Sequence, residues 1–230
     1  TKTFGLTLTT ATQILCITTV MRTFPQKPNI HQKDRNLYIP LVITLLHMLK
    51  KDNITKVLEV FFDDPVPEGI GFQLREISRK IKLAPKSVKL YLEELEKDKL
   101  IIKKKHRIHK YPVYYANRDE SYFKFLKKLN TLRSVKESGL LEYLDEKCMP
   151  DAIILFGSAS RGEDIKGSDI DLYVQCDKKA VDLARFEKEL GRNISLFFEK
   201  NFDKLSGELK NNIINGDRLK GYIAPKWKKD

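Results

Sequence analysis

The chain has 230 residues, of which 41% are apolar and 32% are charged. This composition can bury a core for one large or two small domains, and it excludes collagen-like, disordered and disulfide-scaffold proteins. The formal net charge of +12 at pH 7 predicts a polyanionic partner.

Cysteine and hydropathy patterns narrow the setting. Cys16, Cys148 and Cys176 are far apart and form no metal-binding spacing. An odd number of separated cysteines is typical of a reducing compartment, so we expect a cytoplasmic protein. No apolar run reaches the roughly eighteen residues that a membrane helix needs, so we expect no membrane partner.

Residues 1–47 differ in composition from the rest of the chain. They are rich in Thr, hold five Lys and Arg against one acid, and show no helical or strand periodicity. We interpret them as an extension that precedes the compact protein. We assign them no function, and the sequence does not define their order.

Residues 48–118 predict three helices and a hairpin. Apolar residues recur at helical spacing over 54–62, 73–81 and 85–98, and Pro85 suits the first position of the third helix. The extended run 100–102, a basic tip at 103–107 and a return strand at 111–115 follow. This order resembles the winged helix-turn-helix family.

The resemblance implies DNA binding, with the third helix in the major groove and the hairpin on phosphate. The segment carries seventeen Lys and Arg against ten acids, which supports this interpretation. The candidate DNA-binding residues are Lys86, Ser87, Lys89, Lys103, Lys104, Lys105 and Arg107. The alternative is a packing or dimerisation module whose lysines form a solvated face. His106 and His109 have no Cys or acid nearby, which disfavours a metal site.

Residues 119–148 form a predicted helical connector, which Gly139 divides into two helices. The apolar side chains suit a segment that joins two domains and covers one face of a sheet. A homodimer seam along the connector is an alternative that nothing in the sequence requires.

Residues 149–230 contain the most informative motif. The apolar run 152–156 predicts a buried strand, and Gly157 and Ser158 follow it. Glycine permits a tight turn near a ligand, and a helix that opens at Ser158 would present free N–H groups to phosphate. Ten residues later, Asp169 and Asp171 share one face of a strand. Two adjacent carboxylates repel unless a cation lies between them, and such oxygen ligands suit Mg²⁺.

The segment 157–174 resembles the signature of the DNA polymerase beta nucleotidyltransferase superfamily, and most closely its minimal nucleotidyltransferase branch. The resemblance implies an α+β chain in which a mixed β-sheet flanked by helices follows the winged helix. It also implies two Mg²⁺ ions and transfer of a nucleoside monophosphate from a triphosphate, for which we expect ATP.

By this resemblance Gly157 and Ser158 hold the triphosphate, while Asp169 and Asp171 bind metal and carry catalysis. Arg161 and Ser168 join the expected nucleotide-binding set, with Arg161 either neutralising phosphate charge or pinning the loop.

The expected third acidic ligand is missing from its usual place. Ser195 occupies that position on the predicted strand 193–199. Because residues 195, 197 and 199 share a face, Glu199 is the candidate replacement metal ligand. The alternative is that Glu199 is a surface residue at the end of the strand.

The remaining elements complete the expected domain. Helices are predicted over 179–190 and 202–214, followed by an edge strand at 221–223. We therefore expect four segments: an extension (1–47), a winged helix-turn-helix domain (48–118), a connector (119–148) and a nucleotidyltransferase domain (149–230).

Two functions remain open from the sequence. The first is a Mg²⁺-dependent enzyme that nucleotidylates a macromolecular acceptor, as minimal nucleotidyltransferase antitoxins do to partner toxins, coupled to a DNA-binding winged helix. The second is a winged-helix transcriptional regulator whose degenerate nucleotidyltransferase domain only binds nucleotide. In a further variant, the front half docks a protein partner instead of DNA.

Overall fold

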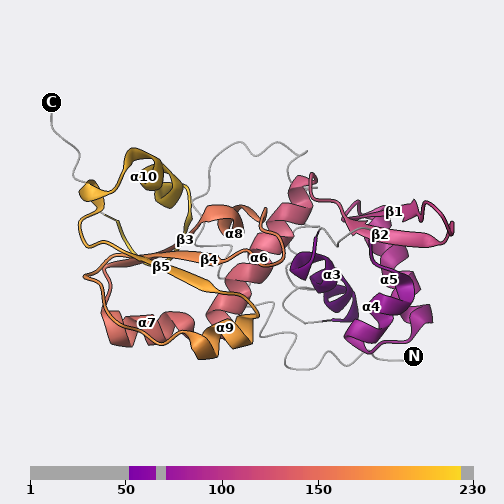
Figure 1. The fold of residues 1–230 in the computed structure, drawn as a ribbon, viewed down its shortest axis with the longest axis horizontal. Helices are drawn as coiled ribbons and strands as arrows, with labels where there is room; N and C mark the ends of the chain where they lie inside the picture. Colours follow the sequence, from indigo (N-terminus) through magenta and orange to yellow (C-terminus); the bar gives the residue numbers. More distant parts are fainter. Residues whose placement is uncertain (1–51, 66–70, 224–230) are drawn as a thin grey trace, which may run out of the picture. The chain divides into compact units, whose positions relative to one another are not determined.

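A computed structural model describes residues 52–65 and 71–223 (Figure 1). All of these residues lie in one compact unit, Lys50–Asp230. The predicted extension, 1–47, lies outside the described residues. No helix within the described part of the chain is both long and apolar enough to cross a membrane.

The first elements are three helices and an antiparallel hairpin. In chain order they are α3 (Asn53–Asp63), α4 (Leu74–Ile81), α5 (Pro85–Lys97), β1 (Ile101–Lys105) and β2 (Pro112–Ala116). The Asp52 side chain caps α3 by accepting a hydrogen bond from the Thr55 N–H at 2.9 Å. Pro85 occupies the first turn of α5, where its missing N–H leaves no hydrogen bond broken.

These elements share a small apolar core. Phe61 and Phe72 are buried and pack edge to face with ring centroids 5.5 Å apart. Phe72 also exchanges two backbone hydrogen bonds of 2.9 Å with Tyr114 of β2, so the chain before α4 extends the hairpin by one bridge. The predicted order of helices and strands is thus present, and its assignment to the winged helix family stays a prediction.

The second part of the chain places helices around a four-stranded sheet. The helices are α6 (Ser121–Glu137), α7 (Leu140–Cys148), α8 (Gly157–Arg161), α9 (Ala184–Leu190), the 3₁₀ turn η1 (Phe202–Lys204) and α10 (Gly207–Ile214). The strands are β3 (Ala152–Phe156), β4 (Ile170–Val174), β5 (Ile194–Phe198) and β6 (Asp217–Gly221).

The sheet has the order β5-β4-β3-β6. Strand β3 is antiparallel to both β4 and β6, whereas β4 and β5 are parallel. The structure therefore confirms the prediction of an α+β chain with a mixed sheet flanked by helices.

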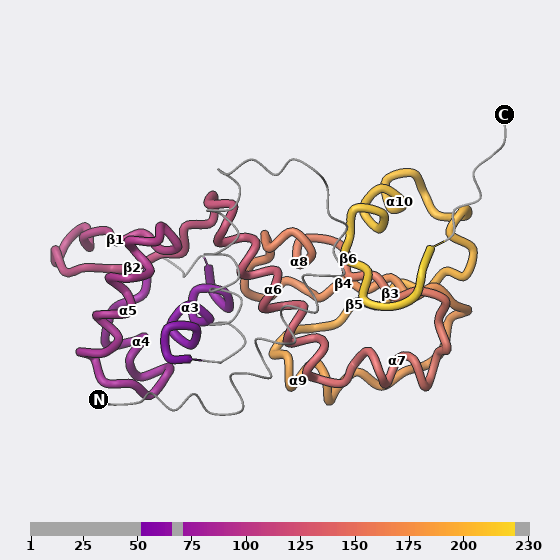
Figure 2. The backbone as a smooth tube through the Cα atoms, turned by 180° about the vertical axis from the view of Figure 1, so that it is seen from behind, coloured from indigo at the N-terminus to yellow at the C-terminus, as the bar shows by residue number. Residues whose placement is uncertain are grey.

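Two layers of helices cover the sheet. Figures 1 and 2 show α10 on one face and α7 with α9 on the other. Side chains alternate accordingly: Ile153 and Leu172 join the cluster beneath α7 and α9, while Ile154 and Tyr173 pack with Ile213 of α10. Because Asp171 lies two residues before Tyr173, its side chain belongs to the α10 face.

Several element boundaries differ from the sequence expectations. The segment 103–105, expected in a basic tip, is part of β1, because its backbone pairs with β2. The helix expected over 179–190 begins at Ala184, because the Asp182 carboxylate accepts the Ala184 N–H at 3.1 Å and holds a turn before it. The helix expected over 202–214 is divided, since the Ser206 hydroxyl caps a new helix start. The last strand spans 217–221 rather than 221–223.

Candidate functional site

The turn after β3 brings Gly157 against the Asp171 carboxylate. Phe156, the last residue of β3, pairs with Asp171 of β4. Gly157 has a φ of +73°, and a Cβ atom there would overlap Asp171 Oδ2. Glycine is therefore required twice, by the left-handed backbone and by the carboxylate beside it.

Asp171 and Asp169 form the acidic pair. Asp171 is partly buried, and this burial, together with the nearby charge of Asp169, raises its pKa. Asp169 is exposed, and its Oδ1 accepts a hydrogen bond from Asn193 Nδ2 at 3.3 Å. A hard cation shared by the two side chains would offset the repulsion that acts on ionised Asp171, and carboxylate oxygens are suitable ligands for such an ion.

The neighbouring strand places a hydroxyl rather than a carboxylate beside this pair. In the parallel register Asp171 is paired with Ser195, which is exposed. Glu199 follows the end of β5, four residues beyond Ser195, or about 13 Å along an extended chain. The Glu199 carboxylate accepts the Asn201 N–H at 2.8 Å. The structure does not bring Glu199 to the pair.

The donor set of the acidic pair suits a divalent cation only in part. Two carboxylates next to a glycine turn fit one such ion that completes its shell with water and phosphate oxygens. Within the described residues, no group of three or more His, Cys, Asp or Glu is arranged to hold a metal by itself. The residues thus fit a cation bound together with a substrate better than a self-sufficient metal centre.

The other residues predicted to bind nucleotide lie in or after α8. Ser158 is the second residue of α8, directly after the Gly157 turn. Arg161 ends α8, is exposed, and pairs through Nε with Glu163 Oε2 at 2.9 Å. The Ser168 hydroxyl accepts the Ile165 N–H at 3.0 Å and shapes the loop before β4. Of the two roles weighed for Arg161, this ion pair favours pinning the loop.

A buried ionic cluster, which contacts the acidic pair through the Asp169 backbone carbonyl, was not predicted from the sequence. It consists of Lys127 of α6, Asp164 of the loop after α8, and Arg192 of the turn before β5. The side chains of Lys127 and Asp164 are 3% and 4% exposed, and Lys127 Nζ lies 3.2 Å from Asp164 Oδ2. Arg192 Nη1 lies 3.0 Å from the same oxygen.

One signal for this cluster was present in the sequence. Lys127 lies four residues from both Phe123 and Thr131, on the line of α6 that is buried. A lysine on the apolar line of a helix requires an acidic partner in the core. The sequence alone could not show that this partner is Asp164, which is 37 residues away.

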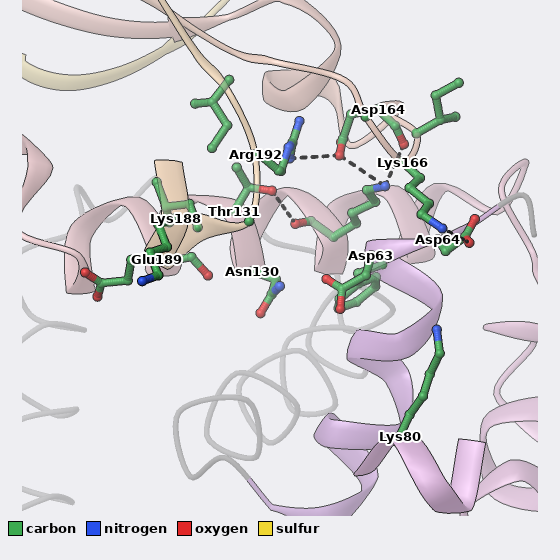
Figure 3. Close-up of a pocket in the computed structure, with 18 residues that line it drawn as sticks. Asp63, Asp64, Lys80, Asn130, Thr131, Asp164, Lys166, Lys188, Glu189 and Arg192 are labelled. Carbon is green, nitrogen blue, oxygen red and sulfur yellow. Dashed lines mark hydrogen bonds and ion pairs between the residues drawn. The ribbon is translucent and has the colours of Figure 1, made fainter. Parts of the chain in front are cut away.

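A pocket of about 500 Å³ borders this cluster (Figure 3). It is lined by parts of α3, α4 and α6, by the loop 164–167, and by the end of α9 with the turn that follows it, 188–192. Arg192 and Asp164 face each other at its wall, and Lys166 pairs with Asp64 at 3.4 Å. Asp169 and Asp171 are not among the residues that line it, so the acidic pair lies outside this pocket.

The predicted DNA-binding residues lie on two elements. Lys86, Ser87 and Lys89 lie at the start of α5, and Lys103, Lys104 and Lys105 lie along β1, with Arg107 in the tip that follows. All are exposed except Ser87, which is partly buried. Lys89 and Lys103 also lie near acids of α5, at 3.8 Å from Glu93 and 3.9 Å from Glu96.

The hairpin tip is also aromatic. The rings of His106, His109 and Tyr111 stack on one another, with centroid separations of 4.6 to 5.9 Å. Both histidines therefore have a packing role within the tip.

The second part of the chain thus packs a Gly-Ser turn against an Asp-x-Asp strand within a mixed sheet. Residues 139–219 match the family model described as Polymerase beta, Nucleotidyltransferase. This match supports the DNA polymerase beta-like superfamily for the segment from α7 into β6, and with it a transferase of nucleotidyltransferase type. It leaves α3, α4, α5 and the hairpin outside. No curated protein and no solved structure gives a significant match to the chain.

Proposed function

We propose that the protein is a Mg²⁺-dependent nucleotidyltransferase that uses ATP and modifies a macromolecular, preferably protein, acceptor. The observation that carries this proposal is the contact between the Gly157 turn and the Asp171 carboxylate, with Asp169 beside it. The turn that we propose to hold phosphate thereby meets the acidic pair at one end of the central strands β3 and β4, and both lie within the matched residues 139–219.

The chain's own residues divide the work of the reaction. Gly157 and Ser158 offer backbone N–H groups to the triphosphate, and Asp169 and Asp171 hold the cation. An acceptor hydroxyl oxygen forms a bond to the α-phosphorus, the bond to the β-phosphate oxygen breaks, and pyrophosphate leaves with the bonding electrons. The acceptor proton passes to an aspartate of the pair. Bound Mg²⁺ supplies charge neutralisation on the phosphates.

The geometry favours one well-held cation over two. The resemblance implies two Mg²⁺ ions, but Ser195 stands where the strand register would allow a third carboxylate. A hydroxyl is a weaker ligand for a hard dication than a carboxylate. We therefore expect the ion that Asp169 and Asp171 would hold to bind more tightly than any second ion.

Label transfer from ATP tests this function. The full chain is incubated with Mg²⁺ and ATP labelled at the α-phosphate, alone and with host-cell extract as a source of acceptors. We expect a labelled macromolecule with the wild type and none with Asp169→Asn/Asp171→Asn. The exposed pair Asp177→Asn/Asp203→Asn is the matched control and should retain transfer. Absence of label transfer in every condition would contradict the proposal that the protein is a nucleotidyltransferase.

We further propose that α3, α4, α5 and the hairpin act as a DNA-binding winged helix. The supporting observation is that exposed lysines occupy the start of α5 and the last three positions of β1. Lysine contacts to phosphate give affinity that falls steeply with salt.

The salt dependence of DNA binding tests the winged helix. Lys103→Ala/Lys104→Ala/Lys105→Ala should weaken binding and flatten the slope of log K against log salt by up to about 3. Lys147→Ala/Lys178→Ala/Lys204→Ala removes the same charge from exposed positions elsewhere and should leave the slope nearly unchanged. If the wild type shows no salt-dependent DNA binding, docking of a protein partner becomes the better proposal for α3, α4, α5 and the hairpin.

Ser195 favours a second candidate, a regulator whose domain binds nucleotide without transfer. In that case ATP with Mg²⁺ would change DNA affinity in the wild type while no label is transferred to any acceptor. Loss of that effect in Asp169→Asn/Asp171→Asn would support the regulator, and label transfer by the wild type would exclude it.

A further inference from the structure

Arg192 makes three charge-assisted contacts around the loop that leads to the acidic pair. Its Nε donates to the Ser168 carbonyl at 2.9 Å, and its Nη2 donates to the Asp169 carbonyl at 3.0 Å. Its Nη1 lies 3.0 Å from Asp164 Oδ2. One guanidinium thus binds both ends of the segment 164–169.

Asp164 gives the guanidinium a rigid anchor. The Asp164 side chain is 4% exposed, and Lys127 of α6 contacts it twice, at 3.2 Å to Oδ2 and at 2.6 Å to the backbone carbonyl. Figure 3 shows the Arg192 side chain directed at Asp164. A buried carboxylate with two cationic partners is costly to displace, so the position of Arg192 is fixed from behind.

Asp169 needs this support more than Asp171 does. Asp171 lies within β4 and is paired with Phe156 on one side and Ser195 on the other. Asp169 precedes the strand, and its exposed carboxylate has one hydrogen bond in the structure, to Asn193. Because a side chain follows the orientation of its own peptide, a carbonyl held by Arg192 limits where the Asp169 carboxylate can point.

We propose that Arg192 is a positioning residue that holds the Asp169 carboxylate beside Asp171, with Asp164 and Lys127 fixing the guanidinium. The inference rests on the proposed function, since it takes the two aspartates to be the cation site. Arg192 does not itself contact substrate or metal in this role.

Geometry and charge can be separated by the choice of substitution. Arginine is planar and reaches three acceptors in fixed directions, whereas a lysine ammonium keeps the charge without the fork. If Arg192 acted only through its positive charge near the pair, Arg192→Lys would preserve cation binding. If it acts through its hydrogen bonds to two carbonyls, Arg192→Lys should weaken cation binding nearly as much as Arg192→Gln does.

The test measures Mn²⁺ binding by the full chain, using electron paramagnetic resonance of free Mn²⁺. We expect Arg192→Lys and Arg192→Gln each to weaken Mn²⁺ at least about tenfold, as substitutions behind metal ligands commonly do. Arg185 of α9 is exposed, so Arg185→Lys and Arg185→Gln are the matched controls and should bind as the wild type does.

Folding is monitored in parallel by circular dichroism and thermal unfolding. Where the Arg192 variants do not fold, Asp164→Asn replaces them: it keeps the side-chain shape, weakens the anchor, and should still reduce Mn²⁺ affinity severalfold. A folded Arg192→Lys or Asp164→Asn protein with wild-type affinity would overturn the positioning role.

The same titration distinguishes the two levels of proposal. Wild-type binding that disappears in Asp169→Asn/Asp171→Asn but persists in Arg192→Lys leaves the cation site intact and removes only the role of Arg192. Equal binding by the wild type and Asp169→Asn/Asp171→Asn would remove the cation site, and the inference with it.

Discussion

Ser195 determines how many acidic ligands the candidate site offers. It is paired with Asp171 across the parallel strands, and its exposed side chain leaves space for a larger side chain at this position. A carboxylate at position 195 would therefore point to the same side as the acidic pair.

Ser195→Asp should consequently strengthen divalent cation binding. We expect Mn²⁺ affinity to rise severalfold and label transfer to increase, because a third carboxylate adds a hard anionic ligand. Ser195→Asn has nearly the same shape without the charge and should show neither gain. Weaker Mn²⁺ binding by Ser195→Asp than by Ser195→Asn would show that the position does not face the cation.

The thiol of Cys176 predicts an alkaline loss of stability. Cys148 and Cys176 are buried free cysteines, and burial, with the nearby Cys148 thiol, raises the pKa of Cys176 from 9.0 to about 11. Between these two values the unfolded chain has lost a proton that the folded chain retains. The free energy of unfolding should therefore fall as the pH rises from about 9 towards 11.

Denaturant unfolding of the wild type and Cys176→Ala between pH 8 and 10.5 measures this contribution. The variant should show the shallower decline, since it lacks the titrating thiol. Parallel slopes for the two proteins would refute the assignment.

At the residue scale, the sequence was informative where chemistry is local. Gly157, Asp169 and Asp171 follow from a short motif, and the structure places the glycine directly against Asp171. Arg192 could not be found in this way, because its acceptors are two backbone carbonyls and a carboxylate more than twenty residues earlier. A backbone carbonyl has no sequence signature.

Helix α6 has a charged residue on its buried line. Its buried line contains Phe123, Lys127, Thr131 and Val135. Burial lowers the pKa of Lys127, and the charge and hydrogen bond of Asp164 oppose that effect. The ion pair therefore maintains the charge of a side chain that would otherwise be costly in the core.

Lys127→Met should destabilise the protein by about 3 kcal/mol, because it leaves buried Asp164 with Arg192 as its remaining cationic partner. The free energy of unfolding in denaturant measures this loss. Lys136→Met, on the exposed face of the same helix, should change it by less than about 0.5 kcal/mol. Equal effects of both substitutions would contradict a structural role for the buried pair.

Element boundaries were predictable where a residue with a strong conformational preference lies at the boundary. Gly139, with a φ of +74°, separates α6 from α7 as expected, and Pro85 begins α5. At the two misplaced helix starts a polar side chain bonds to nearby backbone: Asp182 accepts the Ala184 N–H just before α9, and Ser206 caps α10. Both lie inside segments whose apolar spacing continues through them. Periodicity alone does not register a side chain that hydrogen-bonds its own backbone.

At the scale of the whole compact unit, an ion pair joins its first helix to the second part. Arg133 of α6 binds Glu59 of α3 at 2.7 Å, with side chains 15% and 31% exposed. Partly buried pairs of this kind contribute more than exposed ones, although still modestly.

A double-mutant cycle with Glu59→Leu and Arg133→Met should give a coupling energy of about 1 kcal/mol in the free energy of unfolding. Lys89→Met and Glu93→Leu, an exposed pair on α5, provide the comparison and should couple by less than about 0.5 kcal/mol. A coupling energy no larger for Glu59 and Arg133 than for the α5 pair would show that this ion pair does not stabilise the protein.

The net charge is divided unevenly between the two parts of the chain. The segment 48–118 has a large basic excess, whereas residues 119–230 hold twenty-one Lys and Arg against twenty acids. Much of the second part's charge is neutralised internally, as in the Lys127, Asp164 and Arg192 cluster. This partition followed from the sequence, but the pairing inside the core required the structure.

The close approach of Gly157 to Asp171 has a thermodynamic consequence. A Cβ at position 157 would overlap Asp171 Oδ2, so the turn that we propose to bind phosphate lies directly against the carboxylate that we propose to bind the cation. Occupancy at one should therefore bias the other, and such linkage is reciprocal: whatever factor the nucleotide adds to the affinity for the ion, the ion returns to the nucleotide. The two ligands would then bind as a cooperative pair, and their affinities would be defined only jointly.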